Sequence, residues 1–157
     1  MKKLSYLFLV LFSLSFIACS SDDDSSGDGG GDNSLYIKYT VNGVNYEFEP
    51  ATITSLQKLI MGEQEINSVY NRISLWMPVT PTVGSHAITD ETPNDTNLET
   101  LHNAELWVGD ATYTATSGTL VITELNDDYV KGTFTFTGED ENGVTISVTN
   151  GSFRAYR

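Results

Sequence analysis

From residue 35 to the C-terminus, apolar and polar residues alternate along almost every stretch between turn signals. In residues 35–41 (LYIKYTV) the apolar side chains share one face, and in residues 44–49 (VNYEFE) they share the matching face. Asn42-Gly43 separates the two runs, and an Asn-Gly pair between alternating runs is the strongest short-range signal of a β-hairpin. Because a period of two places successive side chains on opposite faces of a strand, the pattern predicts strands rather than helices.

Further alternating runs, divided by Gly, Asn, Asp and Ser, predict more strands. The divisions include Gly109-Asp110, Ser117-Gly118, residues 126–128 and Asn142-Gly143. A short helix is expected only in residues 97–103. The spacing predicts an all-β domain, an antiparallel sandwich or barrel-like fold of about 9–11 short strands. The predicted runs after the first hairpin are 53–61, 69–77, 83–88, 104–108, 111–116, 119–125, 129–137, 144–150 and 152–156.

The first eighteen residues have the composition of a secretory signal. Met1-Lys2-Lys3 is followed by an apolar run that ends at Ala18, and this run is too short and wrongly flanked to span a membrane. With Ala18 directly before Cys19, residues 1–18 resemble a bacterial lipoprotein signal peptide. That resemblance implies cleavage before Cys19 and a lipid on the Cys19 thiol. Cys19 is the only cysteine of the chain, which excludes disulfides and cysteine metal sites from the rest of it.

Residues 19–34 follow as a segment without apolar residues beyond Cys19. Residues 20–34 (SSDDDSSGDGGGDNS) contain only Ser, Asp, Gly and Asn, so they predict a disordered acidic tether. Fully extended, such a tether spans at most about 50 Å. An acidic run after the lipidated cysteine also resembles the surface-export signal of Bacteroidota-type lipoproteins. We therefore expect an outer-membrane protein that is lipid-anchored and faces the cell exterior, with a single all-β domain in residues 35–157.

The charge of the chain excludes one class of partner. The whole sequence has 8 basic and 21 acidic residues, and residues 33–157 have 6 basic and 16 acidic residues, a formal charge of −10. Such a charge opposes contact with the phosphate backbone, so no nucleic-acid partner is expected.

The C-terminal part of the chain carries a family resemblance. The motifs are VNGVNYEF near residue 41, PTVGSHAI near residue 81, and SGTLVITELNDDYVKGTFTFTGEDENGVTISVTNGSF from residue 117. These segments resemble a family of small uncharacterised Bacteroidota-type surface lipoproteins with a single β-sandwich-like domain of unknown function. The motifs are turns and core strands, so the resemblance implies a fold and no catalytic residues.

Two tryptophans lie on the same face of their predicted strands as the polar residues. In residues 69–77, Trp76 shares a face with Tyr70 and Arg72, opposite the apolar residues of the same run; in residues 104–108, Trp107 lies opposite the apolar residues. An outward indole offers a flat apolar face and a polar N–H to a ligand. Tyr70, Arg72, Trp76 and Trp107 are therefore the predicted ligand-binding residues. The alternative is that a loop or the opposite sheet covers this face, or that a bulge shifts which residues point outward.

Residues that could act in catalysis or bind a metal have weaker sequence signals than the predicted ligand-binding residues. His86 and His102 flank several carboxylates, but their spacing matches no compact ligand motif. Ser85 and His86 are adjacent and so point to opposite faces of a strand, which argues against a nucleophile and its base. The acidic loops at 139–143 and 126–128 offer oxygen ligands for calcium, although such residues are also expected in hairpin turns. No catalytic residue, cofactor or metal is predicted.

The sequence thus predicts a lipid-anchored surface protein, most simply a non-enzymatic binding or interaction domain. Its expected partners are the membrane, through the lipid on Cys19, and a glycan or an envelope protein. Two alternatives stay open: a hydrolase that uses carboxylates with His86 and His102, and a structural envelope component without a small ligand.

Overall fold

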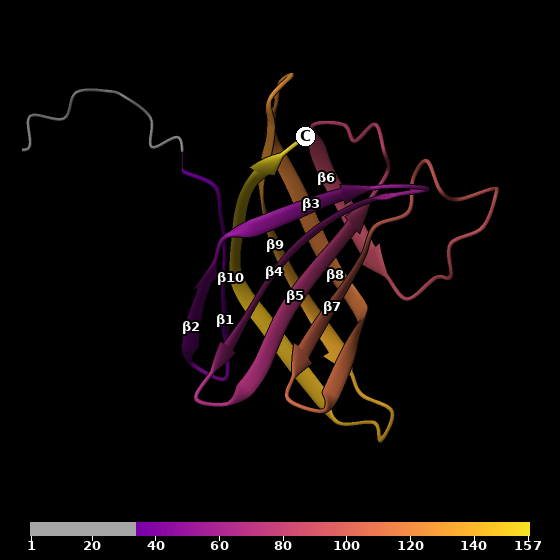
Figure 1. Cartoon of the computed structure of the whole chain (residues 1–157). Helices are drawn as coiled ribbons and strands as arrows, with labels where there is room; N and C mark the ends of the chain where they lie inside the picture. The colour runs from indigo at the N-terminus through magenta and orange to yellow at the C-terminus, as the bar shows by residue number, and fades with distance from the viewer. Residues whose placement is uncertain (1–33) are drawn as a thin grey trace, which may run out of the picture. The chain divides into compact units, whose positions relative to one another are not determined.

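The alternating runs form ten strands in the computed structural model, which describes residues 34–157 (Figure 1). All pairings are antiparallel, and the described residues contain no helix. The predicted signal peptide, Cys19 and all but the last residue of the predicted tether lie outside the described residues. The strands are β1 Tyr36–Val41, β2 Val44–Phe48, β3 Pro50–Thr54, β4 Lys58–Ile66, β5 Val69–Met77, β6 Gly84–Thr89, β7 Asn103–Val108, β8 Ala111–Leu125, β9 Tyr129–Glu139 and β10 Thr145–Tyr156.

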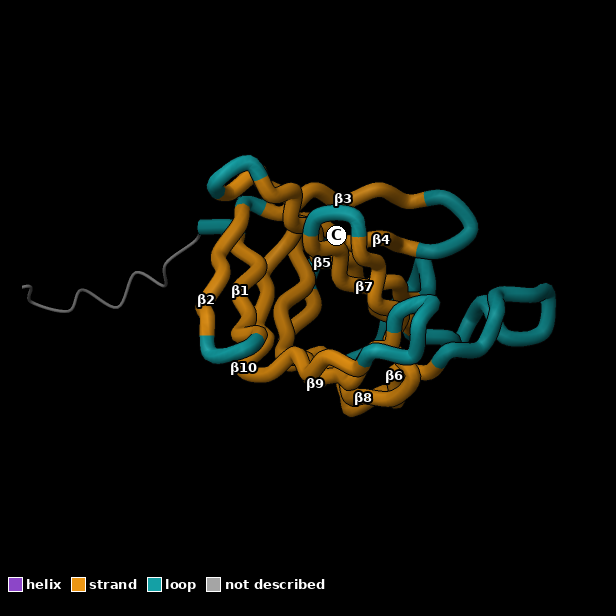
Figure 2. Tube along the Cα trace, turned by 90° about the horizontal axis from the view of Figure 1, so that it is seen from below, coloured by secondary structure: helices purple, strands orange, loops and turns teal. Residues whose placement is uncertain are grey.

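The strands make one sheet that nearly closes into a barrel. Its order is β2-β1-β10-β9-β8-β7-β5-β4-β3, with β6 beside β8. The two end strands, β2 and β3, follow each other in the chain with only Glu49 between them, so the sheet returns to its starting point (Figure 2). The Thr52 hydroxyl of β3 also donates a hydrogen bond of 3.0 Å to the Tyr156 carbonyl of β10. The fold is therefore all-β and barrel-like, as the alternation predicts.

The inner face of the sheet forms the core. Ile37 and Tyr39 of β1, Ile73 and Leu75 of β5, and Phe153 of β10 are almost completely buried. These residues occupy every second position, so the intervening side chains face outward. Burial weakens toward one end of β2, from Phe48 through the half-buried Tyr46 to Val44, which is 52% exposed.

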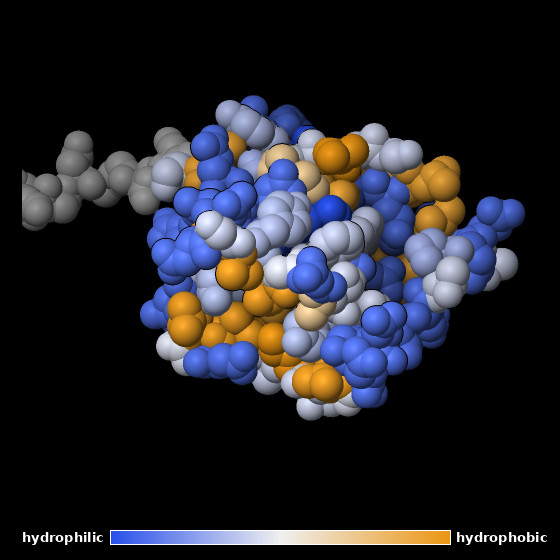
Figure 3. Space-filling model, turned by 60° about the horizontal axis from the view of Figure 1, so that its bottom comes forward, coloured by the Kyte–Doolittle hydropathy of each residue, from blue (hydrophilic) through white to orange (hydrophobic). Residues whose placement is uncertain are grey.

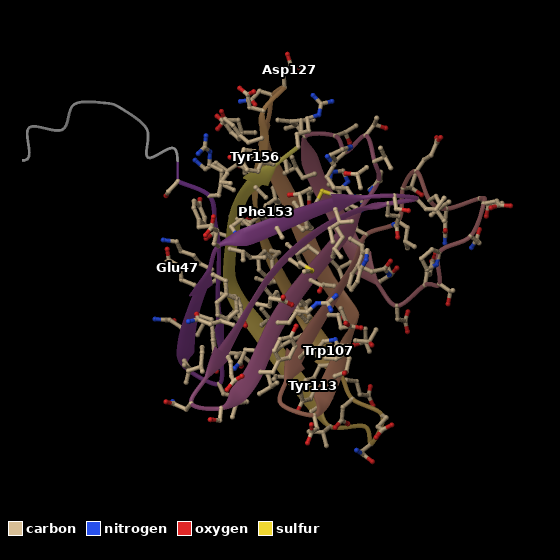
Figure 4. The ribbon with its side chains drawn as sticks, viewed as in Figure 1. Glu47, Trp107, Tyr113, Asp127, Phe153 and Tyr156 are labelled. Atoms are coloured by element: carbon tan, nitrogen blue, oxygen red, sulfur yellow. The ribbon has the colours of Figure 1, made fainter. Side chains whose placement is uncertain are left out.

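Four connections lie together at one end of the barrel (Figure 1). We call this the hairpin end; it contains the turns β1–β2 (Asn42-Gly43), β4–β5 (Asn67-Ser68), β7–β8 (Gly109-Asp110) and the β9–β10 loop (140–144). Both central residues of the first two turns have positive φ, as type I′ hairpins require. The C-terminus and the start of β1 lie at the opposite end, where Figure 4 labels Tyr156 and Asp127.

Several predicted boundaries were wrong. Residues 53–61 are not one strand, because a turn at 55–57 divides β3 from β4. Ser117-Gly118 is no turn but lies inside the continuous strand β8, and the runs 144–150 and 152–156 both belong to β10. Residues 97–103 contain no helix: residues 97–100 form turns, and residues 101–102 connect them to the start of β7.

Candidate functional site

Three of the four predicted ligand-binding residues lie together on the outer face of the sheet. Arg72 of β5 pairs directly with Trp107 of β7, and its guanidinium carbon lies 5.5 Å from the centre of the indole. The Tyr70 ring meets the same indole edge-on, with 6.5 Å between ring centres and 85° between ring planes. We call Tyr70, Arg72 and Trp107 the aromatic cluster; Figure 4 shows Trp107 toward the hairpin end.

Two carboxylates that the sequence did not single out complete this cluster. Glu63 of β4 pairs with Arg72 and accepts a hydrogen bond from the Tyr70 hydroxyl, while Glu105 accepts one from the Trp107 indole N–H. The hydrogen bond to Glu63 is the main reason that the pKa of Tyr70 is raised. Arg72 also donates from Nε to the Ser74 hydroxyl at 2.9 Å. Hydrogen bonds therefore hold the orientations of all three side chains of the cluster.

Trp76 lies on the same outer face but away from the cluster. It is four residues beyond Arg72 on β5, which corresponds to about 13 Å along a strand. Its partners in the register are Leu59 on β4 and Asn103 on β7. The structure therefore brings Tyr70, Arg72 and Trp107 into one group and leaves Trp76 outside it.

The aromatic cluster has the chemistry of a binding surface. An indole and a phenol offer apolar area for the carbon-bearing face of a ring-shaped ligand. Arg72 adds donors, while Glu63 and Glu105 add acceptors, and hydroxyl groups pair with both kinds of group. The cluster holds no thiol, histidine or serine–base pair, so its side chains suit recognition rather than covalent chemistry.

The two histidines converge in a second place. The rings of His86 on β6 and His102 stack, with 4.3 Å between their centres and 15° between their planes. They border a hollow of about 370 Å³ together with Ser85, Glu91 and Thr100. Of the carboxylates near the histidines in sequence, Glu91 is the one that lines this hollow.

The hydrogen bonds of these histidines indicate packing more than catalysis. His86 donates from Nε2 to the Thr82 carbonyl at 2.8 Å, and His102 donates from Nδ1 to the Thr100 carbonyl at 2.9 Å. His102 is only 3% exposed, and burial lowers its pKa to about 4. Neither ring hydrogen-bonds to a carboxylate within the described part of the chain, so no carboxylate–histidine pair orients a base.

The acidic loops use their side chains locally. The Asp140 carboxylate accepts hydrogen bonds from the backbone N–H groups of Asn142 and Val144, and the Asn126 amide oxygen accepts from Asp128 and Tyr129. Such bonds stabilise turns. Among residues 34–157, no group of three or more His, Cys, Asp and Glu side chains is arranged to hold a metal ion.

Comparisons with known proteins give no match to this chain. No family model matches the chain, and neither a curated protein nor a solved structure matches it. Within residues 34–157, no helix has the length and apolar character needed to cross a membrane. The resemblance to surface lipoproteins stays a prediction.

Proposed function

We propose that this protein is a non-enzymatic binding domain, held at the outer membrane by a lipid on Cys19, and that its ligand is a glycan bound at the aromatic cluster. The observation that supports the proposal is the outward-facing group of Tyr70, Arg72 and Trp107, in which the Tyr70 hydroxyl and the Trp107 indole N–H each donate a hydrogen bond to a carboxylate. Aromatic side chains of two separate strands come together there, with Trp107 half-buried and Tyr70 exposed on the outer face of the sheet.

The charge of the domain narrows the class of glycan. Residues 33–157 carry a formal charge of −10, which repels uronic acids, sulfated sugars and phosphorylated sugars. Neutral sugars escape this repulsion, and amino sugars are attracted by Glu63 and Glu105. A neutral or amino-sugar glycan is therefore the ligand class that we propose. An envelope protein is the alternative ligand.

Binding of the full chain to an array of neutral, amino and acidic glycans tests this function. The Trp107→Ala substitution removes the central ring of the cluster and should weaken binding at least about tenfold, the scale of an aromatic hot spot. Trp76→Ala is the matched control, since Trp76 lies on the same face of β5 but outside the cluster. It should bind like the unchanged chain.

Other outcomes would contradict the proposal. Equal binding by the Trp107→Ala variant and the unchanged chain would remove the aromatic cluster from glycan recognition. Equal losses in both tryptophan variants would indicate a general loss of structure, which circular dichroism of each variant checks. If no glycan binds, a stable protein partner recovered by gentle cross-linking would favour the structural envelope component instead.

A further inference from the structure

The hairpin end of the barrel exposes valines where turns usually carry polar residues. Val44, Val69 and Val144 are 52%, 40% and 53% exposed, and each lies in or directly beside a different connection at this end. Figure 3, which brings this end forward, shows a continuous hydrophobic area bordered by hydrophilic residues. Exposed apolar area of this kind is typical of an interaction site.

The register explains why these valines gather. Each of the three tight hairpins closes with a pair of apolar residues directly beside its turn. The β4–β5 and β7–β8 tips also touch, because a Cβ at Gly109 would lie 3.7 Å from a Val69 methyl group and the Gly109 N–H donates to the Tyr70 carbonyl. The closing pairs are Val41–Val44, Ile66–Val69 and Val108–Ala111. Val41 belongs to the buried core, and the other five residues form the valine rim together with Val144.

The charged residues in the connections of the hairpin end have a single sign. The connections at this end, residues 41–44, 65–69, 108–111 and 139–145, contain five carboxylates and no Lys, Arg or His. Between the β7–β8 turn and the β9–β10 loop lies a hollow of about 350 Å³, lined by Asp110, Asp140 and Glu141 with Ala111, Thr112 and Asn142. An ammonium or guanidinium group beside apolar side chains is complementary to this surface.

We propose that the valine rim is a docking surface for a protein segment that carries lysine or arginine next to apolar side chains. Two other occupants are disfavoured by charge. A second copy would bring the same acidic rim against this one, and an anionic membrane surface would be repelled by the same carboxylates. The proposal goes beyond glycan binding, because the valine rim and its acidic hollow contain none of the residues of the aromatic cluster.

Fluorescence anisotropy with labelled peptides tests the docking surface, using the full chain in a non-ionic detergent. The probe is the peptide KVKVKVK, with EVEVEVE and KSKSKSK as comparison peptides. We expect KVKVKVK to bind more tightly than either comparison peptide, and its binding to weaken as salt is added. The triple variant Val44→Ser, Val69→Ser, Val144→Ser should weaken binding at least about tenfold.

Control substitutions outside the valine rim show whether a loss of peptide binding is specific to the rim. Val79→Ser with Val83→Ser alters valines that are 40% and 61% exposed but lie in the β5–β6 connection, away from the rim, and should leave peptide binding unchanged. Asp110→Asn with Glu141→Gln should weaken binding without touching a valine, and Asp95→Asn with Glu99→Gln should not. Trp107→Ala should keep peptide binding, which separates this proposal from the glycan site.

Three results would overturn the proposal. The first is binding of EVEVEVE as tightly as KVKVKVK, and the second is equal loss in the rim variant and in the Val79/Val83 variant. The third is self-association of the unchanged chain in sedimentation that the triple rim variant abolishes, since a second copy would then be the occupant.

Discussion

At the scale of single residues, His102 is a buried side chain whose ionisation the fold opposes. It is 3% exposed, it stacks on His86, and its Nε2 has no hydrogen-bond partner among the described residues. Burial is the main cause that lowers its pKa to about 4, and the nearby His86 lowers it further, against the opposing effect of the Thr100 carbonyl. An ordinary histidine titrates near about 6.5, so the folded chain binds this proton much more weakly than the unfolded chain does.

This difference predicts a loss of stability in mild acid. The stability that neutral His102 contributes is complete above its unfolded pKa and is lost as the pH falls from about 6.5 toward about 4, because the unfolded chain is protonated first. Between pH 7 and pH 5 the free energy of unfolding should fall by about 1–2 kcal/mol more in the unchanged chain than in His102→Gln. Urea unfolding at both pH values measures the difference. Equal falls in the two proteins would contradict the prediction.

Some residues of the candidate site can be predicted from the sequence alone, and others cannot. The alternation of apolar and polar residues predicts that Tyr70, Arg72 and Trp107 lie on the outer face of the sheet. Their meeting depends on the pairing of β5 with β7, which the sequence does not specify. Glu63 and Glu105 were missed for the same reason, because each looks like any solvated strand residue until its aromatic neighbour is known.

At the scale of elements, a bulge distorts β10, the strand that the sequence pattern predicts as two separate strands. The register between β9 and β10 shifts between Val148 and Gly151, so two residues of β10 face one residue of β9. Asn150 occupies the bulge with a φ of 52°, and its side-chain amide donates to the Thr40 hydroxyl at 3.3 Å. The bulge bends β10 without ending it, which is why residues 144–156 read as two strands in sequence.

A β-branched residue at this bulge should destabilise the fold. Asn150→Val places a branched side chain in the left-handed region and should cost about 1–3 kcal/mol of unfolding free energy. Asn150→Gly should cost less, because glycine adopts this conformation readily. Thr149→Val, one residue away and also exposed, is the control and should change little. Chemical unfolding of the three variants measures these effects, and a fully stable Asn150→Val protein would refute the argument.

Gly118 shows why turn signals mislead inside long strands. Ser117-Gly118 predicts a turn, yet β8 continues through it. A Cβ at Gly118 would lie 2.4 Å from the Thr135 carbonyl oxygen and 2.6 Å from Phe136 Cβ. The glycine is therefore needed for close packing of β8 on β9 and not for a change of direction, a distinction that only the tertiary contacts reveal. Alternation and the Asn42-Gly43 hairpin, which depend on local sequence, were predicted correctly.

At the scale of the whole molecule, the proposed lipid anchor would determine where the proposed binding surfaces act. The proposed lipid on Cys19 would join the chain ahead of β1, whose start lies at the opposite end from the hairpin end (Figure 1). The valine rim and the nearby aromatic cluster lie toward the end of the domain that is opposite the start of β1 (Figure 1 and Figure 4). The predicted tether of residues 20–34 would add up to about 50 Å of reach.

The lipid anchor has a direct test in cells that make the protein. The unchanged chain should incorporate radiolabelled palmitate, whereas Cys19→Ser should not, because the Cys19 thiol is the proposed site of acylation. Ser20→Ala is the control and should be labelled normally. The unchanged chain should also enter the detergent phase on phase separation, since stable anchoring takes about two acyl chains. Labelling of the Cys19→Ser variant would disprove the anchor.

The place of β1 within the sheet has a mechanical consequence. β1 is the first strand of the domain, and it is hydrogen-bonded on both edges, to β10 and to β2. A pull on the chain ahead of β1, against a ligand held at the hairpin end, acts along this strand. The ladder bonds run across the strand, so such a pull strains many of them at once instead of opening them one by one. Force resistance is then governed by the rate of unfolding, and β1 is the strand through which a tethered domain would withstand drag.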